Sequence, residues 1–208
     1  MMRIERLVTA PDRAGRYRVQ FDNGSVIRLY RQTVEDFALY TGKELSDEEM
    51  EALSTAAGQM SAKMRAVRIV SASSVSKNEL EHRLVQKGEN PDQAKAAVAW
   101  MEELSLVDDE ETARQIVARC AARGYGIQRA RQALYEKRIP KRYWEDALTD
   151  FPDQTDYILS FLRSKLPDDD PKQVKKAIDA LLRRGHVYSQ IRNALSQLSF
   201  DTDELPED

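Results

Sequence analysis

Polar and apolar residues alternate near the start of the chain. Residues 16–21 read Arg-Tyr-Arg-Val-Gln-Phe, and this period of two predicts a half-buried strand. The dipeptide Asn23-Gly24 follows, which favours a hairpin because both residues tolerate positive φ. Residues 26–30 then form the returning strand. With a partly alternating run before them, they predict three antiparallel strands, which we expect to pack on the first helices because three strands alone are marginally stable.

From residue 46 onward the pattern becomes helical. Ser46 and Glu49 have the spacing of a capping box, in which each side chain satisfies a backbone N–H of the other residue. The same spacing returns at Ser76 and Glu79. Such helix-start patterns, together with glycines placed just after helical runs, predict many short helices of about 10–15 residues.

The helical part repeats. Segments that begin at Leu84, Leu134 and Leu181 can be written in register, at spacings of 50 and 47 residues. Each unit reads helix, loop, helix, tight turn, helix. Such units bury one face internally and another against a neighbour. The predicted fold is therefore mainly α: an elongated tandem array of three three-helix modules behind a small β-rich N-terminal extension.

This organisation divides the chain into five segments. The last of them carries five acidic residues and no base, a composition typical of a disordered tail. The expected domains are a β-rich extension over residues 1–45, a linker helix with the first module over 46–107, the second module over 108–150, the third over 151–199 and the acidic tail over 200–208.

The composition narrows the class of protein. The 208 residues include 32 Lys and Arg against 35 Asp and Glu, a formal net charge of −3. No stretch approaches the ~18 consecutive apolar residues of a membrane span. Cys120 is the single cysteine, so neither an internal disulfide nor a cysteine-based metal cluster is expected. His82 and His186 are the only histidines, so we expect no metal site. From the composition as a whole we expect a monomeric, cytoplasmic protein without a membrane partner.

Catalytic motifs are also missing from the sequence. Gly124-Tyr125-Gly126 is a G-x-G without the rest of a dinucleotide fingerprint, so a flexible turn is the simpler interpretation. The acids of residues 108–111 fit a helix start, where the helix dipole favours negative charge. We therefore expect a binding protein rather than an enzyme, with no cofactor.

Positive charge is concentrated in residues 114–142, which contain nine basic residues and a single acidic one, Glu136. Arginine predominates, and its guanidinium forms planar bidentate contacts to phosphates and carboxylates. Unbalanced positive charge repels itself, which favours an anionic partner over a merely solvated face. That partner could be nucleic acid or an acidic protein groove, and the residues alone do not separate them. The candidate basic face consists of Arg114, Arg119, Arg123, Arg129, Arg131, Lys137, Arg138, Lys141 and Arg142.

A second set of bases lies in the last module. Four of them share a helix face by their spacing, although acids at residues 168–170 and at Asp179 favour an ordinary solvated surface there. This second basic patch consists of Lys172, Lys175, Lys176, Arg183, Arg184 and Arg192.

Several motifs in order resemble the RecX regulatory family over roughly residues 60–200. The run Leu106-Val107-Asp108-Asp109 with Ala113 resembles the family's L-x-D-D-x-x-x-A opening. A G-x-G turn at residues 124–126 and a helix end at residues 134–139 follow. The closing run Arg183-Arg184-Gly185-His186 resembles its R-R-G-F motif. Two residues depart from the pattern: Arg138 stands where glycine is usual, and His186 where phenylalanine is usual.

The resemblance implies a regulator of the RecA recombinase, and so a role in recombination, DNA repair and the SOS response. Members bind RecA and its filament on single-stranded DNA, and typically inhibit its ATPase, strand-exchange and coprotease activities without catalysis of their own. We expect the array to lie in the filament groove, with a direct contact to DNA left open. The alternative is a protein that binds DNA directly, without preference for the recombinase. Whether the effect is inhibition or stimulation stays open.

Overall fold

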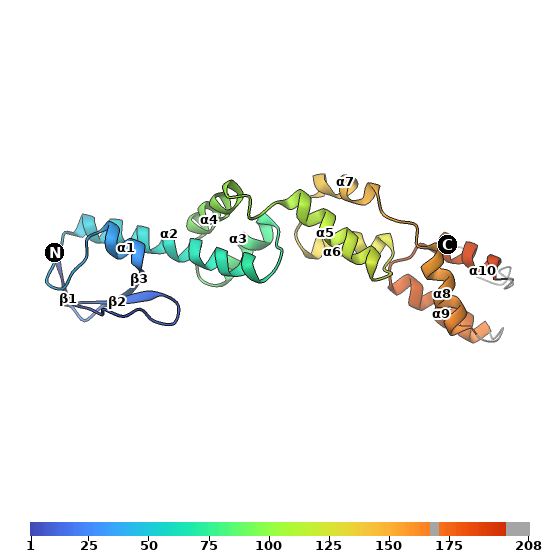
Figure 1. The fold of residues 1–208 in the computed structure, drawn as a ribbon, viewed down its shortest axis with the longest axis horizontal. Coiled ribbons are helices and arrows are strands. Elements are labelled where there is room, and N and C mark those ends of the chain that lie inside the picture. Colours follow the sequence, from blue (N-terminus) through green and yellow to red (C-terminus); the bar gives the residue numbers. More distant parts are fainter. Residues whose placement is uncertain (167–170, 199–208) are drawn as a thin grey trace. The chain divides into compact units, whose positions relative to one another are not determined.

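The structure is a computed structural model that describes residues 1–166 and 171–198. The acidic segment 200–208 and the acids at 168–170 lie outside the described residues. The chain divides into two compact units, Met1–Val107 and Asp108–Asp208, which we call unit 1 and unit 2 (Figure 1). Helices predominate and a small antiparallel sheet lies at the N-terminus, which confirms the predicted mainly helical fold class.

Unit 1 begins with the sheet, which has four strands rather than three. Strands β1 (Met2–Leu7), β2 (Arg16–Phe21), β3 (Val26–Tyr30) and β4 (Glu44–Leu45) pair antiparallel in the order β3-β2-β1-β4. Strand β4 was not among the predicted strands, because two residues are too few to show a period. Pairing with β1 and burial of its leucine on the sheet core define this strand.

Two helices cover the inner face of the sheet (Figure 1). One is the short α1 (Arg31–Asp36), and the other is the first half of α2 (Asp47–Ala72). Leu53 of α2 is fully buried against Ile4 and Phe21 of the strands. Burial of these large side chains provides the hydrophobic stabilisation that the strands lack by themselves.

The 26-residue α2 differs from the expected short helices. It starts at the predicted capping box, where Ser46 accepts from the Glu49 N–H and Glu49 accepts from the Ser46 N–H. The helix then continues without a break into the first group of helices. Its second half contributes Ala62 and Ala66 to the next core. One helix thus supports the sheet at one end and a helical bundle at the other.

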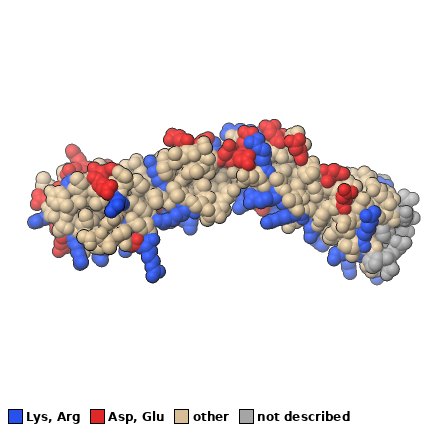
Figure 2. Space-filling view, viewed as in Figure 1, with Lys and Arg blue, Asp and Glu red and all other residues tan. Residues whose placement is uncertain are grey.

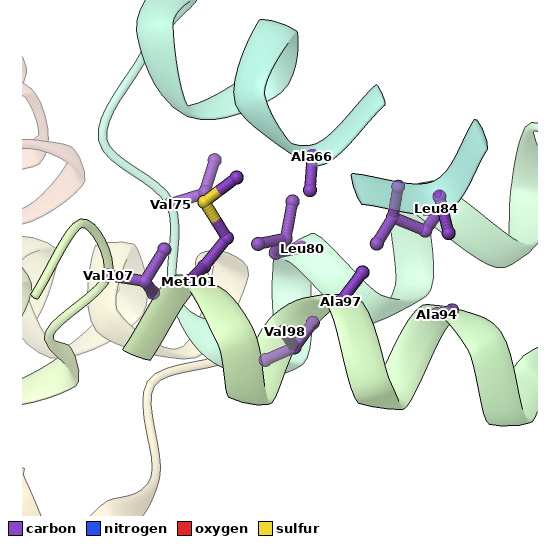
Figure 3. Close-up of a cluster of buried hydrophobic side chains, with 10 residues drawn as sticks. Ala66, Val75, Leu80, Leu84, Ala94, Ala97, Val98, Met101 and Val107 are labelled. Atoms are coloured by element: carbon purple, nitrogen blue, oxygen red, sulfur yellow. The ribbon is translucent and has the colours of Figure 1, made fainter. Parts of the chain in front are cut away.

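The helices form three groups of three, each around its own buried cluster. Figure 3 shows the first cluster, where Leu80 and Leu84 of one helix point toward alanines of α2 and the following helix. The first group comprises α2, α3 (Lys77–Gln86) and α4 (Pro91–Glu103), the second α5 (Asp109–Ala122), α6 (Ile127–Glu136) and α7 (Trp144–Thr149), and the third α8 (Thr155–Lys165), α9 (Pro171–Arg183) and α10 (Tyr188–Gln197).

The middle helix of each group ends in the same kind of turn. Gly88, Arg138 and Gly185 all have positive φ, of 90°, 54° and 84°. The N–H of the following residue then donates to the carbonyl of Leu84, Leu134 or Leu181, at 3.1, 3.0 and 3.1 Å. This is the hydrogen bond of a Schellman motif. The arginine that stands in place of the usual glycine therefore leaves the turn geometry intact.

Candidate interaction surface of unit 2

The first helix of unit 2 separates apolar from basic side chains. Its N-terminus is capped by Asp108, which accepts from the N–H groups of Glu110 and Glu111 at 2.8 and 3.1 Å. Ile116 and Cys120 lie in the core, whereas Arg114, Arg119 and Arg123 are exposed. This is the amphipathic arrangement that the hydrophobic spacing predicted.

Arg114, Arg129 and Arg131 of the candidate face form ion pairs. Arg114 contacts Glu110 at 2.6 Å, Arg129 contacts Glu136 at 3.0 Å, and Arg131 contacts Glu145 at 3.2 Å. Two of these acids lie just outside residues 114–142, where the count along the chain did not include them. The side chains are largely solvent-exposed, so each pair contributes little to stability. The pairs nevertheless reduce the net positive charge of the face.

Three guanidinium groups gather near the thiol of Cys120. Burial raises the pKa of this thiol, while the positive charges of Arg129, Arg123 and Arg119 lower it. Glu136 acts on the same thiol in the opposite direction. The last turn of α5, its C-cap and the first turn of α6 contribute these arginines. We call Arg119, Arg123 and Arg129 the arginine cluster of unit 2.

The remaining bases of the candidate face follow α6. Arg138, Lys141 and Arg142 are exposed, and Lys137 is half-buried. Arg142 stacks over the ring of Tyr143 with its guanidinium carbon 4.7 Å from the ring centre. Over unit 2, Figure 2 shows mainly basic side chains along the edge beneath α5 and α6, and acidic and basic side chains next to each other along the opposite edge near α7.

The second basic patch divides into three environments. Lys172 and Lys176 line an open groove of about 500 Å³ with Lys165 and Phe161. Lys175, Arg183 and Arg192 are exposed on α9 and α10. Arg184 stands apart from them, because it is half-buried and donates to the hydroxyl of Tyr157.

Aromatic rings surround the Arg184 guanidinium. Its carbon lies 5.8 Å from the ring centre of Tyr125, 5.8 Å from that of Tyr157 and 5.6 Å from that of Phe161. Such cation–π contacts are strongest where the cation is shielded from water. Arg184 therefore connects the second and third groups of helices instead of extending a surface patch.

The glycine turn at 124–126 belongs to the same contact. The Gly126 N–H donates to the Arg184 carbonyl at 3.0 Å, and the Gln128 N–H donates to the Gly185 carbonyl at 3.1 Å. A Cβ on Gly126 would lie 2.1 Å from the Gly185 oxygen, closer than any side chain can approach. The sequence analysis interpreted this segment as a flexible turn, whereas the structure shows a buried one packed against the turn between α9 and α10.

His186 completes this contact. It is 2% exposed, stacks on the Tyr157 ring at 5.7 Å, and its Nε2 lies 3.0 Å from the Gly124 carbonyl oxygen. Burial lowers its pKa, the hydrogen bond to Gly124 raises it, and the charge of Arg184 lowers it, with a net lowering. A neutral ring that donates from Nε2 fits this environment. The histidine therefore occupies the buried aromatic position where phenylalanine is usual.

Sequence reasoning passed over one buried acid in unit 1. Glu89 is 8% exposed and accepts from Arg65 at 2.6 Å and from Ser61 at 3.0 Å. It follows the turn glycine as His186 does in the third group, and register with the other modules could have marked it as buried. The contact to α2 gives it a structural role.

Metal and membrane chemistry find no support in the described residues. Within them, no three His, Cys, Asp or Glu side chains come together as a metal site would require. None of the helices in the described ranges is long and apolar enough to cross a bilayer.

These observations define a protein built of repeated three-helix groups. The family model described as "RecX, second three-helix domain" matches residues 108–148. The regulatory protein RecX of Chlorobaculum tepidum is 31% identical over 134 residues, which cover 62% of this chain and 83% of that protein. The chain belongs to the RecX family of regulatory proteins.

Further comparisons agree with this assignment. The regulatory protein RecX of Vibrio parahaemolyticus is 28% identical over 141 residues, which cover 66% of this chain and 91% of that protein. A crystal structure of regulatory protein RecX aligns with a TM-score of 0.64 at 20% identity, over 93% of this chain and all of that one. RecX from Lactobacillus salivarius aligns with a TM-score of 0.61 at 20% identity, over 69% of this chain and 98% of that one. These two structures share the fold.

Proposed function

We propose that this chain binds the RecA recombinase and its filament on single-stranded DNA, and that it inhibits the ATPase, strand-exchange and coprotease activities of the filament from within the filament groove. Family membership supports the choice of partner. We further propose that the protein acts as a cytoplasmic monomer and catalyses no reaction itself.

The arginine cluster of unit 2 carries the proposal. Arg119 and Arg123 are exposed and make no ion pair within the described residues, while the half-buried Arg129, which pairs with Glu136, also acts on the nearby Cys120 thiol. Guanidinium groups bind carboxylates and phosphates in a bidentate manner, so the cluster suits an acidic groove on a protein filament. Arg119 and Arg123 therefore carry positive charge that the Arg129–Glu136 pair does not neutralise, and an anionic partner would relieve their repulsion.

Repetition supports binding to a polymer. We propose that the domains predicted from the sequence act as successive contacts, and that the second basic patch adds to the arginine cluster of unit 2. Weak contacts on one chain reinforce one another, because the first contact raises the effective concentration of the next. Filament would then bind more tightly than free recombinase.

The test compares three targets at low and high salt: the recombinase filament on single-stranded DNA, free recombinase, and bare DNA. ATPase rates are measured in the same samples. We expect preference for the filament and a fall in its ATPase rate. Arg119→Gln with Arg123→Gln should weaken filament binding, whereas Lys87→Gln with Lys95→Gln removes the same charge from exposed positions of unit 1 and should not.

Two results would count against the proposal. Equal filament binding by both double variants would exclude the arginine cluster of unit 2 as the interface. Tight, salt-sensitive binding of the wild-type protein to bare DNA, with no preference for recombinase, would favour the alternative of a direct DNA-binding protein.

A further inference from the structure

The outer face of the N-terminal sheet carries a second group of arginines. Side chains alternate along a strand, so Val19 and Phe21 point into the core while Arg18 lies on the opposite face. On β3, Leu29 is buried and Arg28 is exposed. The pattern that buries one face of the sheet therefore leaves the other basic.

The strand register brings these arginines together. Arg18 is directly opposite Arg28, and Arg6 is opposite Gln20, two residues further along β2. Opposite side chains on neighbouring strands have Cβ atoms about 5 Å apart, and diagonal ones about 7–8 Å apart. Arg6, Arg18 and Arg28 thus form a diagonal row across three strands, which we call the sheet arginine row.

No acid of the described residues forms an ion pair with this row. Arg6, Arg18 and Arg28 form no ion pair or side-chain hydrogen bond within the described residues, and all three are exposed. Neighbouring acids have partners of their own, since Asp12 pairs with Arg16 at 2.9 Å.

Two further carboxylates lie near the row. Glu5 accepts a hydrogen bond from Gln20 at 2.9 Å, and Glu44 is opposite Arg3 on β4 rather than opposite a member of the row. Figure 2 shows mainly basic side chains along the edge of unit 1 that carries the sheet.

The row is held on a rigid support. Arg68 of α2 donates to the Ala14 carbonyl and to the Tyr30 hydroxyl, both at 3.1 Å, and so ties the strands to the helix. Arginines directly opposite each other destabilise a sheet. A surface that is both preorganised and self-repelling gains most from a ligand that carries regularly spaced negative charge.

We infer that the sheet arginine row binds the phosphate backbone of nucleic acid, independently of base sequence. The centre of a protein–protein interface is depleted of charge and rich in aromatic and apolar anchors. Here the centre is charged, and the exposed apolar side chain on this face is Val26 at 42% exposure. Phosphate contacts need no such anchor and are made by arginine and glutamine side chains. The inference does not rest on the proposed recombinase contact of unit 2.

The experiment uses the full chain and a fluorescein-labelled thymidine oligonucleotide, with binding followed by anisotropy across a salt series. On single strands each phosphate contact contributes about 0.7 to the slope of log K against log salt. Arg18→Gln with Arg28→Gln should therefore lower the slope by about 1.4 and weaken binding at about 50 mM salt. Lys87→Gln with Lys95→Gln is the control of equal charge, and Arg18→Lys with Arg28→Lys should retain most of the slope.

Three results would overturn the inference: no binding of the wild-type chain at low salt, an unchanged slope in the Arg18/Arg28 double variant, or the same loss in the control. If the Arg18/Arg28 double variant lost binding to DNA-free recombinase but still bound the oligonucleotide, the row would be assigned to an acidic protein surface instead. The Arg119/Arg123 double variant tests the proposed function separately. It should lose filament inhibition, while its slope of log K against log salt for oligonucleotide binding should stay that of the wild-type chain.

Discussion

The turns at Gly88 and Gly185 have the same backbone geometry but different surroundings. A Cβ on Gly88 would meet nothing within 4 Å, whereas a Cβ on Gly185 would lie 2.2 Å from the backbone nitrogen of Arg129. The first turn ends a helix and faces open space. The second also forms the contact between the second and third groups of helices in unit 2. A repeat in sequence therefore conserves a local shape without conserving what the shape contacts.

The largest difference between the two turns is expected when the glycine of each is replaced by alanine in a separate variant. Gly185→Ala combines left-handed strain with a backbone clash, and should lower the stability of unit 2 by about 3 kcal/mol. Gly88→Ala adds strain alone and should cost unit 1 about 1 kcal/mol. The two tryptophans, Trp100 in unit 1 and Trp144 in unit 2, allow urea unfolding of each unit to be followed by fluorescence in Trp100→Phe or Trp144→Phe backgrounds. Equal losses would contradict a packing role for Gly185.

Gly126→Ala separates the clash from the strain. Gly126 has φ of −76°, which any residue adopts, so the whole effect comes from the approach of the Gly185 carbonyl. Overpacking of this kind should cost about 2 kcal/mol, measured by the Trp144 transition. An unchanged urea midpoint would show that the two turns do not need this close approach.

Acid should weaken the same contact through His186. Its pKa is lowered from the ordinary 6.5, first by burial, so the unfolded chain binds a proton more readily than the folded chain. The stability of unit 2 is therefore fully present above pH 6.5 and falls as the pH drops below that value. His186→Phe keeps an aromatic ring at this position and removes the titrating group. It should flatten the pH dependence of the Trp144 transition, and a curve as steep as the wild type would exclude His186 as its source.

The smallest expected effect concerns the second turn. Arg138 adopts a φ of 54°, which costs a residue with a side chain about 1–2 kcal/mol relative to glycine. Glycine gains freedom in the unfolded chain, which offsets part of this cost. Arg138→Gly should thus stabilise unit 2 by less than about 1 kcal/mol, seen as a higher urea midpoint. A lower midpoint would mean that the arginine makes stabilising contacts that exceed its strain.

Much of the fold could be predicted because its determinants are local. The capping residues Ser46 and Asp108 mark helix starts by hydrogen bonds that span only a few residues. The turn glycines mark helix ends in the same way. Strand β4 and the unbroken length of α2 could not be predicted, since the first depends on pairing with β1 and the second on packing at both ends.

The candidate site was less predictable than the fold. Counting charges along the chain identified the bases of α5 and α6, but it missed Glu110 and Glu145, which pair with two of them from outside the counted stretch. The sheet arginine row escaped notice because its members are distant in sequence. Alternation alone would have placed Arg18 and Arg28 on the same exposed face, and strand register then brings Arg6 beside them.

The sequence by itself determined the helical repeat, the strand pattern at the N-terminus, the turn positions and the resemblance to the RecX family, because each rests on short local patterns and on their order along the chain. Tertiary structure alone decided which charges are paired, which turn is buried and which arginines share a surface. Coulombic and steric interactions depend on distance in space, and the positions of Arg184 and His186 against residues of the preceding module follow from that dependence.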